Sequence, residues 1–371
     1  MTGPAPDASD PEQIETPVGY VDLLRTRANA EKVVSYCRAH GLAWRPHIKT
    51  HKSLAIARIQ LESGARGLTV ATMREAEVMS TLTEDILLAY PPVGSSKLDR
   101  LMRLPEHVDI KVGLDSVEVM RDLAASAAAS GREVGVLIEQ DMGMGRVGLP
   151  SSDAVVELAL RVSETVGVRF RGVMFYPGHV RMSVEDQESH LRIVSDQVQD
   201  LLNGLVETGL ESEIVSGGST PTLWSSHQIE GVTEVRSGSC IFYDREGVDI
   251  GVAGQQDVAY TVLATVVSTA VAGQAVVDAG SKALAKESRG SGDGFGVLMD
   301  HPEVRVAGLS EEHGVLDLTG SDWIPNIGER VRIIPNHVCV SVNLQDQLLG
   351  VEGDVHKLLQ LEGRGRGLWR S

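Results

Sequence analysis

The chain has 371 residues, 42% of them hydrophobic and 23% charged, which is enough for one large domain and a smaller one. Its net charge of −17 and its 4% aromatic content argue against nucleic-acid binding, which needs a basic stripe and stacking side chains. Three widely separated cysteines offer no disulfide framework, and residues 1–15 carry no signal pattern and are expected to be a disordered lead-in. We therefore expect a globular, cytoplasmic protein.

Short apolar runs alternate with helix-length segments from about residue 20 onward. The runs are 43–48, 67–71, 85–89, 108–114, 133–139, 169–175, 213–218 and 232–238, and helices or helical turns are expected between them. Strands that alternate with helices imply parallel pairing, and eight such units have the size of a (β/α)8 barrel. A doubly wound open sheet is the alternative.

The sequence pattern changes after residue 250, where helix-length segments are replaced by short valine-rich runs. We predict a barrel at 20–250 and an antiparallel β domain at 251–371, to which part of 1–19 is a candidate addition. Residues 258–277 carry no charge and are long enough to span a bilayer. Alternating Thr, Ser and Val with a turn at Gly273 instead favour two strands, so no membrane span is expected.

The active sites of such barrels form from the loops at the carboxyl ends of the strands. Polar side chains at these ends are therefore the candidate site residues. They are Lys49 after the first strand, Asp141 to Arg146 after the fifth, Tyr176 and His179 after the sixth, 216–220 after the seventh and 237–239 after the eighth.

The sequence "SGGSTPT" (216–222) is a candidate phosphate site. Gly217 and Gly218 let backbone N–H groups approach an anion, and Ser219 and Thr220 add hydroxyl donors. Gly238 and Ser239, in "SGS" at the neighbouring strand end, strengthen this interpretation because phosphate sites recur after strands 7 and 8. An ordinary turn followed by a helix N-cap is the alternative.

The sequence "RPHIKTHK" (45–52) concentrates bases in an acidic chain. A solvated face or a patch for polyanions is the ordinary explanation. A lysine that is desolvated among cations instead loses its proton easily and can form a Schiff base, so Lys49 with a phosphate loop suggests pyridoxal phosphate. Arg146 could then hydrogen-bond the pyridine nitrogen, although a surface ion pair explains it equally well.

The sequence "PNHVCVSVNL" (335–344) reads as a strand, on which His337 and Cys339 would point to the same face. Imidazole and thiolate are good ligands for zinc. A pair of this kind is more often a core residue beside a rim residue.

Together these segments resemble one family. "RPHIKTHK", "GGSTPT", "DAGSKAL" (278–284), "LSEEHG" (309–314) and "PNHVC" occur in the order found in the D-serine dehydratase and D-threonine aldolase family, whose members are pyridoxal-phosphate enzymes with an alanine-racemase-like barrel. The resemblance implies that Lys49 carries the cofactor as a Schiff base, that Lys52 supports it by its charge, and that His337 and Cys339 bind a divalent metal beside it.

The resemblance also bears on the reaction. Cysteine at position 339 is similar to the zinc-dependent D-serine dehydratases, whereas the D-threonine aldolases carry aspartate there. Pro177 follows Tyr176 where the aldolases have a histidine, with His179 as the candidate substitute, and Val340 stands where the dehydratases have proline. We predict a lyase of D-3-hydroxy amino acids, D-serine dehydratase before aldolase, acting as a homodimer. An amino-acid racemase and a non-catalytic cofactor-binding protein are the alternatives.

Overall fold

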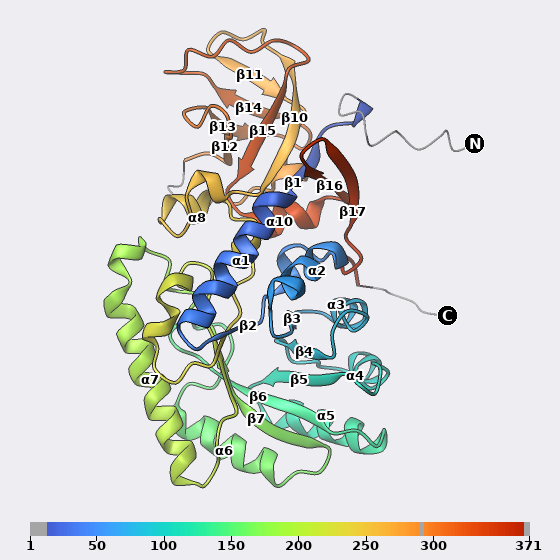
Figure 1. Ribbon diagram of the computed structural model, residues 1–371, viewed down its shortest axis with the longest axis vertical. Helices are drawn as coiled ribbons and strands as arrows, with labels where there is room; N and C mark the ends of the chain where they lie inside the picture. Colours follow the sequence, from blue (N-terminus) through green and yellow to red (C-terminus); the bar gives the residue numbers. More distant parts are fainter. Residues whose placement is uncertain (1–12, 289–292, 367–371) are drawn as a thin grey trace, which may run out of the picture. The chain divides into compact units, whose positions relative to one another are not determined.

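The computed structural model describes residues 13–288 and 293–366, so most of the predicted N-terminal lead-in lies outside it. The described chain divides into two compact units (Figure 1). The barrel unit consists of 31–238 with 362–366, and the β unit consists of 13–30 with 239–361.

The barrel unit contains the parallel sheet expected from the sequence. All eight predicted runs form strands, namely β2 (Ala43–Trp44), β3 (Leu68–Val70), β4 (Asp85–Leu88), β5 (Asp109–Leu114), β6 (Val134–Gln140), β7 (Val168–Phe175), β8 (Ile214–Gly217) and β9 (Glu234–Val235). Their order is β2-β9-β8-β7-β6-β5-β4-β3, every pair is parallel, and a parallel bridge from His47 to Thr69 joins the two ends of the sheet. The barrel prediction is confirmed.

Helices follow most of these strands (Figure 1). They are α2 (Leu54–Ser63), α3 (Met73–Met79), α4 (Ser95–Met102), α5 (Val117–Ala129), α6 (Ser152–Ser163) and α7 (Glu188–Glu207), and α1 (Leu23–Ala39) precedes β2. Side-chain oxygens of Thr72, Ser116 and Ser151 accept a backbone N–H at the first turns of α3, α5 and α6. These N-caps satisfy donors that have no partner inside the helix.

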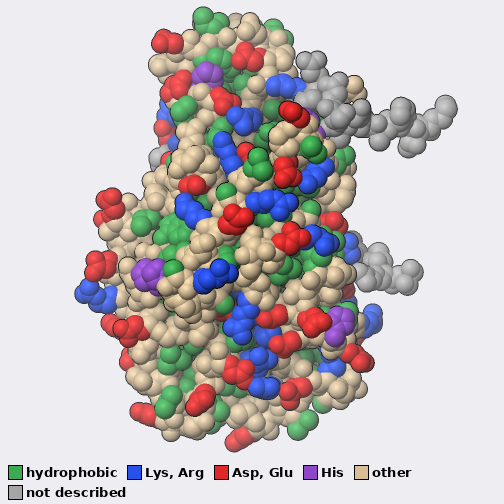
Figure 2. All heavy atoms as spheres, viewed as in Figure 1, with side chains coloured by type: hydrophobic (Ala, Val, Ile, Leu, Met, Phe, Trp, Pro, Cys, Tyr) green, Lys and Arg blue, Asp and Glu red, His purple; other side chains and the backbone are tan. Residues whose placement is uncertain are grey.

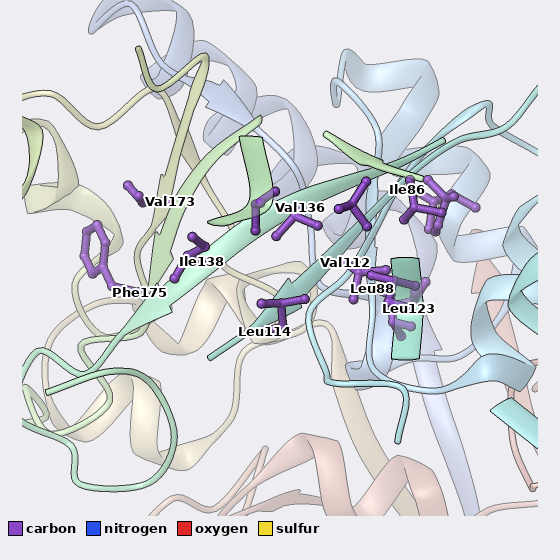
Figure 3. Packing of buried hydrophobic residues seen from close by; sticks show 14 of the residues in the cluster. Ile86, Leu88, Val112, Leu114, Leu123, Val136, Ile138, Val173 and Phe175 are labelled. Atoms are coloured by element: carbon purple, nitrogen blue, oxygen red, sulfur yellow. The ribbon is translucent and has the colours of Figure 1, made fainter. Parts of the chain in front are cut away.

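Alternate residues of each strand face the helices and the barrel interior. Val136 and Ile138 of β6 pack with Leu123 of α5 in the large core between sheet and helices (Figure 3). Leu137, between them, belongs to a small interior cluster with Leu87, Met174 and Ile214. The remaining interior is polar, because β-strand positions there carry charged side chains.

A buried ion network crosses this interior. Arg45 is fully buried, donates from Nε to both oxygens of Glu234 at 2.9 Å, and reaches Asp85 with its terminal nitrogens. Lys111 donates to the same Asp85 at 2.6 Å. Each buried cation thus faces carboxylates, as the cost of burying a charge requires.

The β unit is a nine-stranded sheet. Its strands are β1 (Val18–Asp22), β10 (Tyr260–Ser268), β11 (Gln274–Val277), β12 (Gly296–Leu298), β13 (Arg305–Leu309), β14 (Gly314–Asp317), β15 (Arg330–Pro335), β16 (Gln347–Glu352) and β17 (Val355–Gln360), with helices α8 (Arg245–Asp249), α9 (Ser281–Leu284) and α10 (Val338–Leu344). All pairs are antiparallel except β1 with β16. The expected two strands within 258–277 are β10 and β11.

Two further findings concern the surface. Acidic and basic side chains are interspersed over the face shown in Figure 2, so the excess negative charge is not collected in one patch there. Within the described residues, no helix has the length and apolar character needed to cross a membrane.

Candidate functional site

Lys49 lies on a short, well-anchored turn after β2. The turn is a 3-10 helix, η2 (Ile48–Thr50), whose flanking residues Ile48 and Thr50 are buried while Lys49 is exposed. The backbone N–H groups of His51 and Lys52 both donate to the carbonyl of Ile48. The turn therefore leaves the side chain of Lys49 exposed. We expected this lysine to be desolvated, and within one chain it is not.

The neighbouring bases of "RPHIKTHK" do not form a group of free cations around Lys49. Arg45 is neutralised by Glu234 and Asp85, and Lys52 is paired with Glu75. Burial lowers the pKa of His51 to about 3, so this imidazole is neutral. From the sequence we expected these bases to surround Lys49 as cations. That expectation was wrong, because most of the bases in 45–52 have buried partners.

Tyr176 lies near both Lys49 and Arg146. The Lys49 Nζ is 6.0 Å and the Arg146 guanidinium 4.9 Å from the centre of the tyrosine ring. The loop that carries Arg146 is held by Asp141, whose carboxylate accepts from the N–H groups of Gly143, Met144 and Gly145 at 2.9–3.1 Å. Three predicted site residues are thus brought together at one end of the barrel.

His179 lies against the loop of Arg146. A Cβ placed on Gly143 would meet its imidazole at 3.2 Å, and its Nδ1 is buried without a hydrogen-bond partner among the described residues. No contact with Lys49 is recorded in this part of the chain. Its predicted catalytic role therefore stays a prediction.

The two glycine loops meet beside the Lys49 turn. Gly217, Gly218, Ser219 and Thr220 are buried, and Gly218 has a φ of 83°, which a residue with a Cβ rarely adopts. The Ser237 hydroxyl donates to the Ser219 carbonyl at 2.8 Å, which ties the two loops together. Ser239 begins the next turn, η5 (Ser239–Ile241), which belongs to the β unit.

Gly238 packs directly on the Lys49 turn. A Cβ at this position would meet the His47 carbonyl oxygen at 2.5 Å and the Thr50 hydroxyl at 3.1 Å. The glycine is therefore required by the close approach of two backbones, and the anion loop and the lysine turn are mutually positioned.

The charges around His47 show which cations lie near the Lys49 turn. Burial lowers the pKa of His47, and the nearby charges of Lys49, Arg236 and Lys52 lower it further. Lys52 is paired with Glu75, whereas Lys49 is exposed and is a positive charge available to an anion. Backbone donors, hydroxyls and positive charge beside an accessible lysine together fit a phosphorylated aldehyde cofactor such as pyridoxal phosphate.

Sequence reasoning missed two charged residues here, Arg236 and Glu139. Arg236 donates to the carbonyls of Ser216 and Phe175 at 2.5 and 2.8 Å, and thus ties β7, β8 and the loop after β9. Glu139 is only 5% exposed, and burial raises its pKa although Arg236 and Arg146 lower it. For Glu139 the available signal was a charged residue near the carboxyl end of an otherwise apolar strand, and for Arg236 it was a charged residue directly after a strand end.

The predicted metal ligands lie in the β unit, but not on a strand. Strand β15 ends at Pro335, His337 precedes α10 in extended conformation, and Cys339 lies in its first turn. A valine-rich sequence favours strands only weakly. Here the burial of Val338, Ser341 and Val342 on one face of a helix outweighs that preference. The same-face argument was wrong, because the two residues do not alternate on a strand but lie at the start of a helix.

Carboxylates that the sequence did not single out surround His337. Its Nδ1 lies 3.1 Å from Asp244 Oδ2 and 3.8 Å from Glu246 Oε2. Burial lowers the pKa of His337, but Cys339 and Asp244 outweigh it and raise the pKa to about 11. The surroundings thus favour a positive charge, and the imidazole nitrogen of His337 with the sulfur of Cys339 fits a divalent metal such as zinc.

A parallel barrel with a lysine after its first strand, glycine loops after its last two and an antiparallel β domain defines the alanine-racemase class of fold. Residues 21–246 match the family described as "Alanine racemase, N-terminal domain", and residues 259–351 match "Putative serine dehydratase domain". The chain belongs to the family of pyridoxal-phosphate-dependent D-amino-acid lyases that combine these domains.

Three relatives illustrate this family. The 3-hydroxy-D-aspartate aldolase of Paracoccus denitrificans (strain Pd 1222) is 31% identical over 98% of this chain and 96% of its own length. The D-threo-3-hydroxyaspartate dehydratase of Delftia sp. (strain HT23) is 33% identical over 94% and 98%. The solved D-threonine aldolase from Filomicrobium marinum is 30% identical, with a TM-score of 0.89 over 96% and 97%.

One solved structure of a D-threo-3-hydroxyaspartate dehydratase bears on the metal. It is a cysteine-to-alanine mutant described as metal-free, with a TM-score of 0.84 to this chain. A second mutant of that enzyme replaces a histidine two positions earlier in its chain. The spacing is that of His337 and Cys339.

Proposed function

We propose that this protein is a lyase of D-3-hydroxy amino acids that uses pyridoxal phosphate and a divalent metal, with dehydration of D-serine to pyruvate and ammonia as its reaction. The observation that carries the proposal is the position of His337 and Cys339 at the start of α10, with the imidazole of His337 held beside Asp244. A thiolate selects a Lewis-acidic zinc ion, and elimination of a hydroxyl group needs such an acid.

The barrel unit supplies the cofactor site in this proposal. Lys49 would hold the cofactor, and the N–H and hydroxyl groups of Gly217–Thr220 and of Gly238 and Ser239 would bind its phosphate. Tyr176 and Arg146 would flank it, since Tyr176 contacts both Lys49 and Arg146. When bound, pyridoxal phosphate withdraws electrons from the substrate and acidifies its α-hydrogen.

The chain's own groups then handle the protons and the leaving group. Lys49 Nζ is the group that we assign to accept the α-proton, because it is exposed and no carboxylate pairs with it among the described residues. His337 and Cys339 would hold the metal, which as a Lewis acid makes the 3-hydroxyl a better leaving group.

Retro-aldol cleavage to glycine and an aldehyde is the second candidate function. It is favoured by His179, whose Nδ1 is buried without a partner in the described chain beside the loop of Arg146. A base at that place could deprotonate the 3-hydroxyl and break the Cα–Cβ bond. The aldolases and the hydroxyaspartate dehydratase among the relatives make 3-hydroxy-D-aspartate a substrate to test beside D-serine and D-threonine.

The experiment is product analysis with these three substrates, with and without a chelator. Keto acid and ammonia, lost on chelation and restored by zinc, are the expected result, and Cys339→Ala should abolish them while the cofactor stays bound. Glycine with an aldehyde would replace the dehydratase by the aldolase. Absence of both products from the cofactor-loaded protein would reject the lyase.

Two further parts of the proposal concern the protein in its cell. We propose a cytoplasmic homodimer. The three cysteines are odd in number and far apart in the sequence, which suits a reducing compartment, and the homodimer is what the resemblance to the family implies. Light scattering after gel filtration measures the mass, and a monomer would remove the dimer from the proposal.

A further inference from the structure

Asp244 is the most firmly held carboxylate beside His337. It is 4% exposed and is the N-cap of α8, where its Oδ1 accepts from Gly247 N–H at 3.0 Å. Its Oδ2 faces the His337 Nδ1 at 3.1 Å and accepts from the Val338 N–H at 2.9 Å. The carboxylate thus joins the start of α8 to the start of α10.

An ionised carboxylate only accepts hydrogen bonds, so the Nδ1 of His337 must carry the proton between them. The lone pair of the neutral ring then lies on Nε2. From this arrangement we infer that Asp244 is the positioning residue of the metal centre, which holds His337 in the tautomer and orientation that offers Nε2 to the metal. The inference rests on the metal of the proposed function.

The backbone before Asp244 is shaped to place it. Tyr243 is 1% exposed and has a φ of 53°, which is uncommon for a bulky residue. The N–H groups of Phe242 and Tyr243 both donate to the Ser239 carbonyl, which closes the turn. Strained backbone of this kind persists where the surrounding structure requires it, and it often accompanies a functional group.

Two hydrogen bonds also connect Asn336, the residue before His337, to helix α8. The Arg245 guanidinium donates to the Asn336 side-chain oxygen at 3.3 Å, and the Glu246 N–H donates to the Asn336 carbonyl at 3.4 Å. Residues on both sides of the Asp244–His337 contact are therefore held, and the contact itself does not depend on a flexible loop.

A different arrangement of the same groups is conceivable. Ligand atoms of Asp244, Glu246 and His337 lie within 4.8 Å of one another, so a metal could bind on the Nδ1 side. The oxygens of Asp244 already accept three N–H groups, however, and a cation there would have to displace them. We therefore assign Glu246, 3.8 Å from Nδ1, to the charge around the imidazole and not to the metal.

Asp244→Asn tests the inference, because asparagine caps a helix as well as aspartate does. With its oxygen on the Gly247 N–H, the amide would turn its NH₂ group toward the Val338 N–H and His337 Nδ1 and favour the wrong tautomer. Turned the other way, it would leave the Gly247 N–H without an acceptor and release the N-cap of α8, so the contact is weakened in either orientation. We expect zinc affinity to fall about ten- to hundredfold, the range seen when such supporting partners are removed. Nitrogen-15 signals of labelled histidine in the zinc-loaded protein should show Nδ1–H in the wild type and its loss in the variant.

Asp249→Asn is the matched control, since it removes the same charge from the same helix at a residue paired with Arg245. It should keep zinc affinity and the histidine signals. Unchanged affinity in a folded Asp244→Asn protein would overturn the inference, and so would a wild-type metal bound at Nδ1. The lyase assay separates the two proposals, because Asp244 could fail as a positioning residue in an enzyme that still dehydrates D-serine.

Discussion

Lys52 and Glu75 form an ion pair in the barrel unit, in which the glutamate side chain is fully buried and the lysine side chain is 11% exposed. The second oxygen of Glu75 accepts from the Ala71 N–H at 2.7 Å, and Lys52 has a φ of 55°. Lys49, three residues earlier, is exposed and contacts the ring of Tyr176. The two lysines of this short segment therefore differ in role. Lys52 is paired with a buried carboxylate, and Lys49 remains available to a cofactor.

The first prediction separates these two lysines. Lys49→Ala should abolish the visible absorbance of bound pyridoxal phosphate while leaving the melting temperature near that of the wild type. Lys52→Met should keep the absorbance but destabilise the protein by about 3 kcal/mol, because a buried carboxylate loses its partner. Absorbance retained in Lys49→Ala and lost in a folded Lys52→Met protein would reverse the assignment.

The second prediction concerns the close approach of Gly238 to the Lys49 turn. Gly238→Ala should weaken cofactor affinity by at least about tenfold, because the added Cβ would displace the His47 carbonyl and move the turn by tenths of an ångström. Gly308→Ala is the control, since its Cβ would have only ordinary contacts, at 3.8 Å or more. Titration of the apoprotein with pyridoxal phosphate measures the difference. Equal affinities of the two variants would contradict the proposal that Gly238 positions the glycine loops against the Lys49 turn.

The third prediction follows from the ion network of the barrel interior. Burial raises the pKa of Asp85, but Arg45 and Lys111 outweigh it and hold the pKa below its ordinary value of 3.8. Because the pKa of Asp85 is lower in the folded than in the unfolded protein, the ionised carboxylate stabilises the fold fully above the unfolded-state pKa of about 4. This stabilisation is lost as the pH falls through the folded-state pKa. Asp85→Asn should destabilise the protein by about 2 kcal/mol at neutral pH and by less in acid.

Melting temperatures measured from about pH 7 down to pH 3 check this prediction. The wild-type and Asp85→Asn curves should converge in acid. Asp196→Asn, which removes an exposed carboxylate from α7, should instead run parallel to the wild type. Parallel curves for Asp85→Asn would show that this ion pair contributes nothing to acid sensitivity.

The barrel was predictable because its pattern is local. Runs such as 133–139 are continuous apolar stretches of strand length between helix-length segments, and parallel strands covered on both faces require that pattern. Strand-end reasoning then placed Lys49, Tyr176 and Arg146 at one end of the barrel, where both cations lie near the ring of Tyr176, and their roles at a cofactor stay predictions. The division of labour between Lys49 and Lys52 was not visible, because Glu75 joins them only in three dimensions.

The metal centre shows what a linear pattern omits. Alternating valines made 338–344 look like a strand, yet Pro335 ends the strand and packing selects a helix. Asp244 lies 93 residues before His337, so no spacing in the sequence pointed to it. Partners of buried charges are set by tertiary contacts, and such residues were missed throughout the site.

The last prediction concerns the choice of metal. Cys339→Asp replaces a soft sulfur ligand by a hard oxygen ligand and should lower the ratio of zinc to manganese bound from an equimolar mixture. The ring of His337, held by Asp244 through its Nδ1, is expected to serve both metals equally, so the change reports on position 339 alone. Elemental analysis after equilibration measures the ratio, with Cys37→Ala, a buried thiol in the barrel unit, as control. An unchanged ratio in Cys339→Asp would show that this side chain does not contact the metal, and the chemical basis for preferring dehydration over aldol cleavage would be lost.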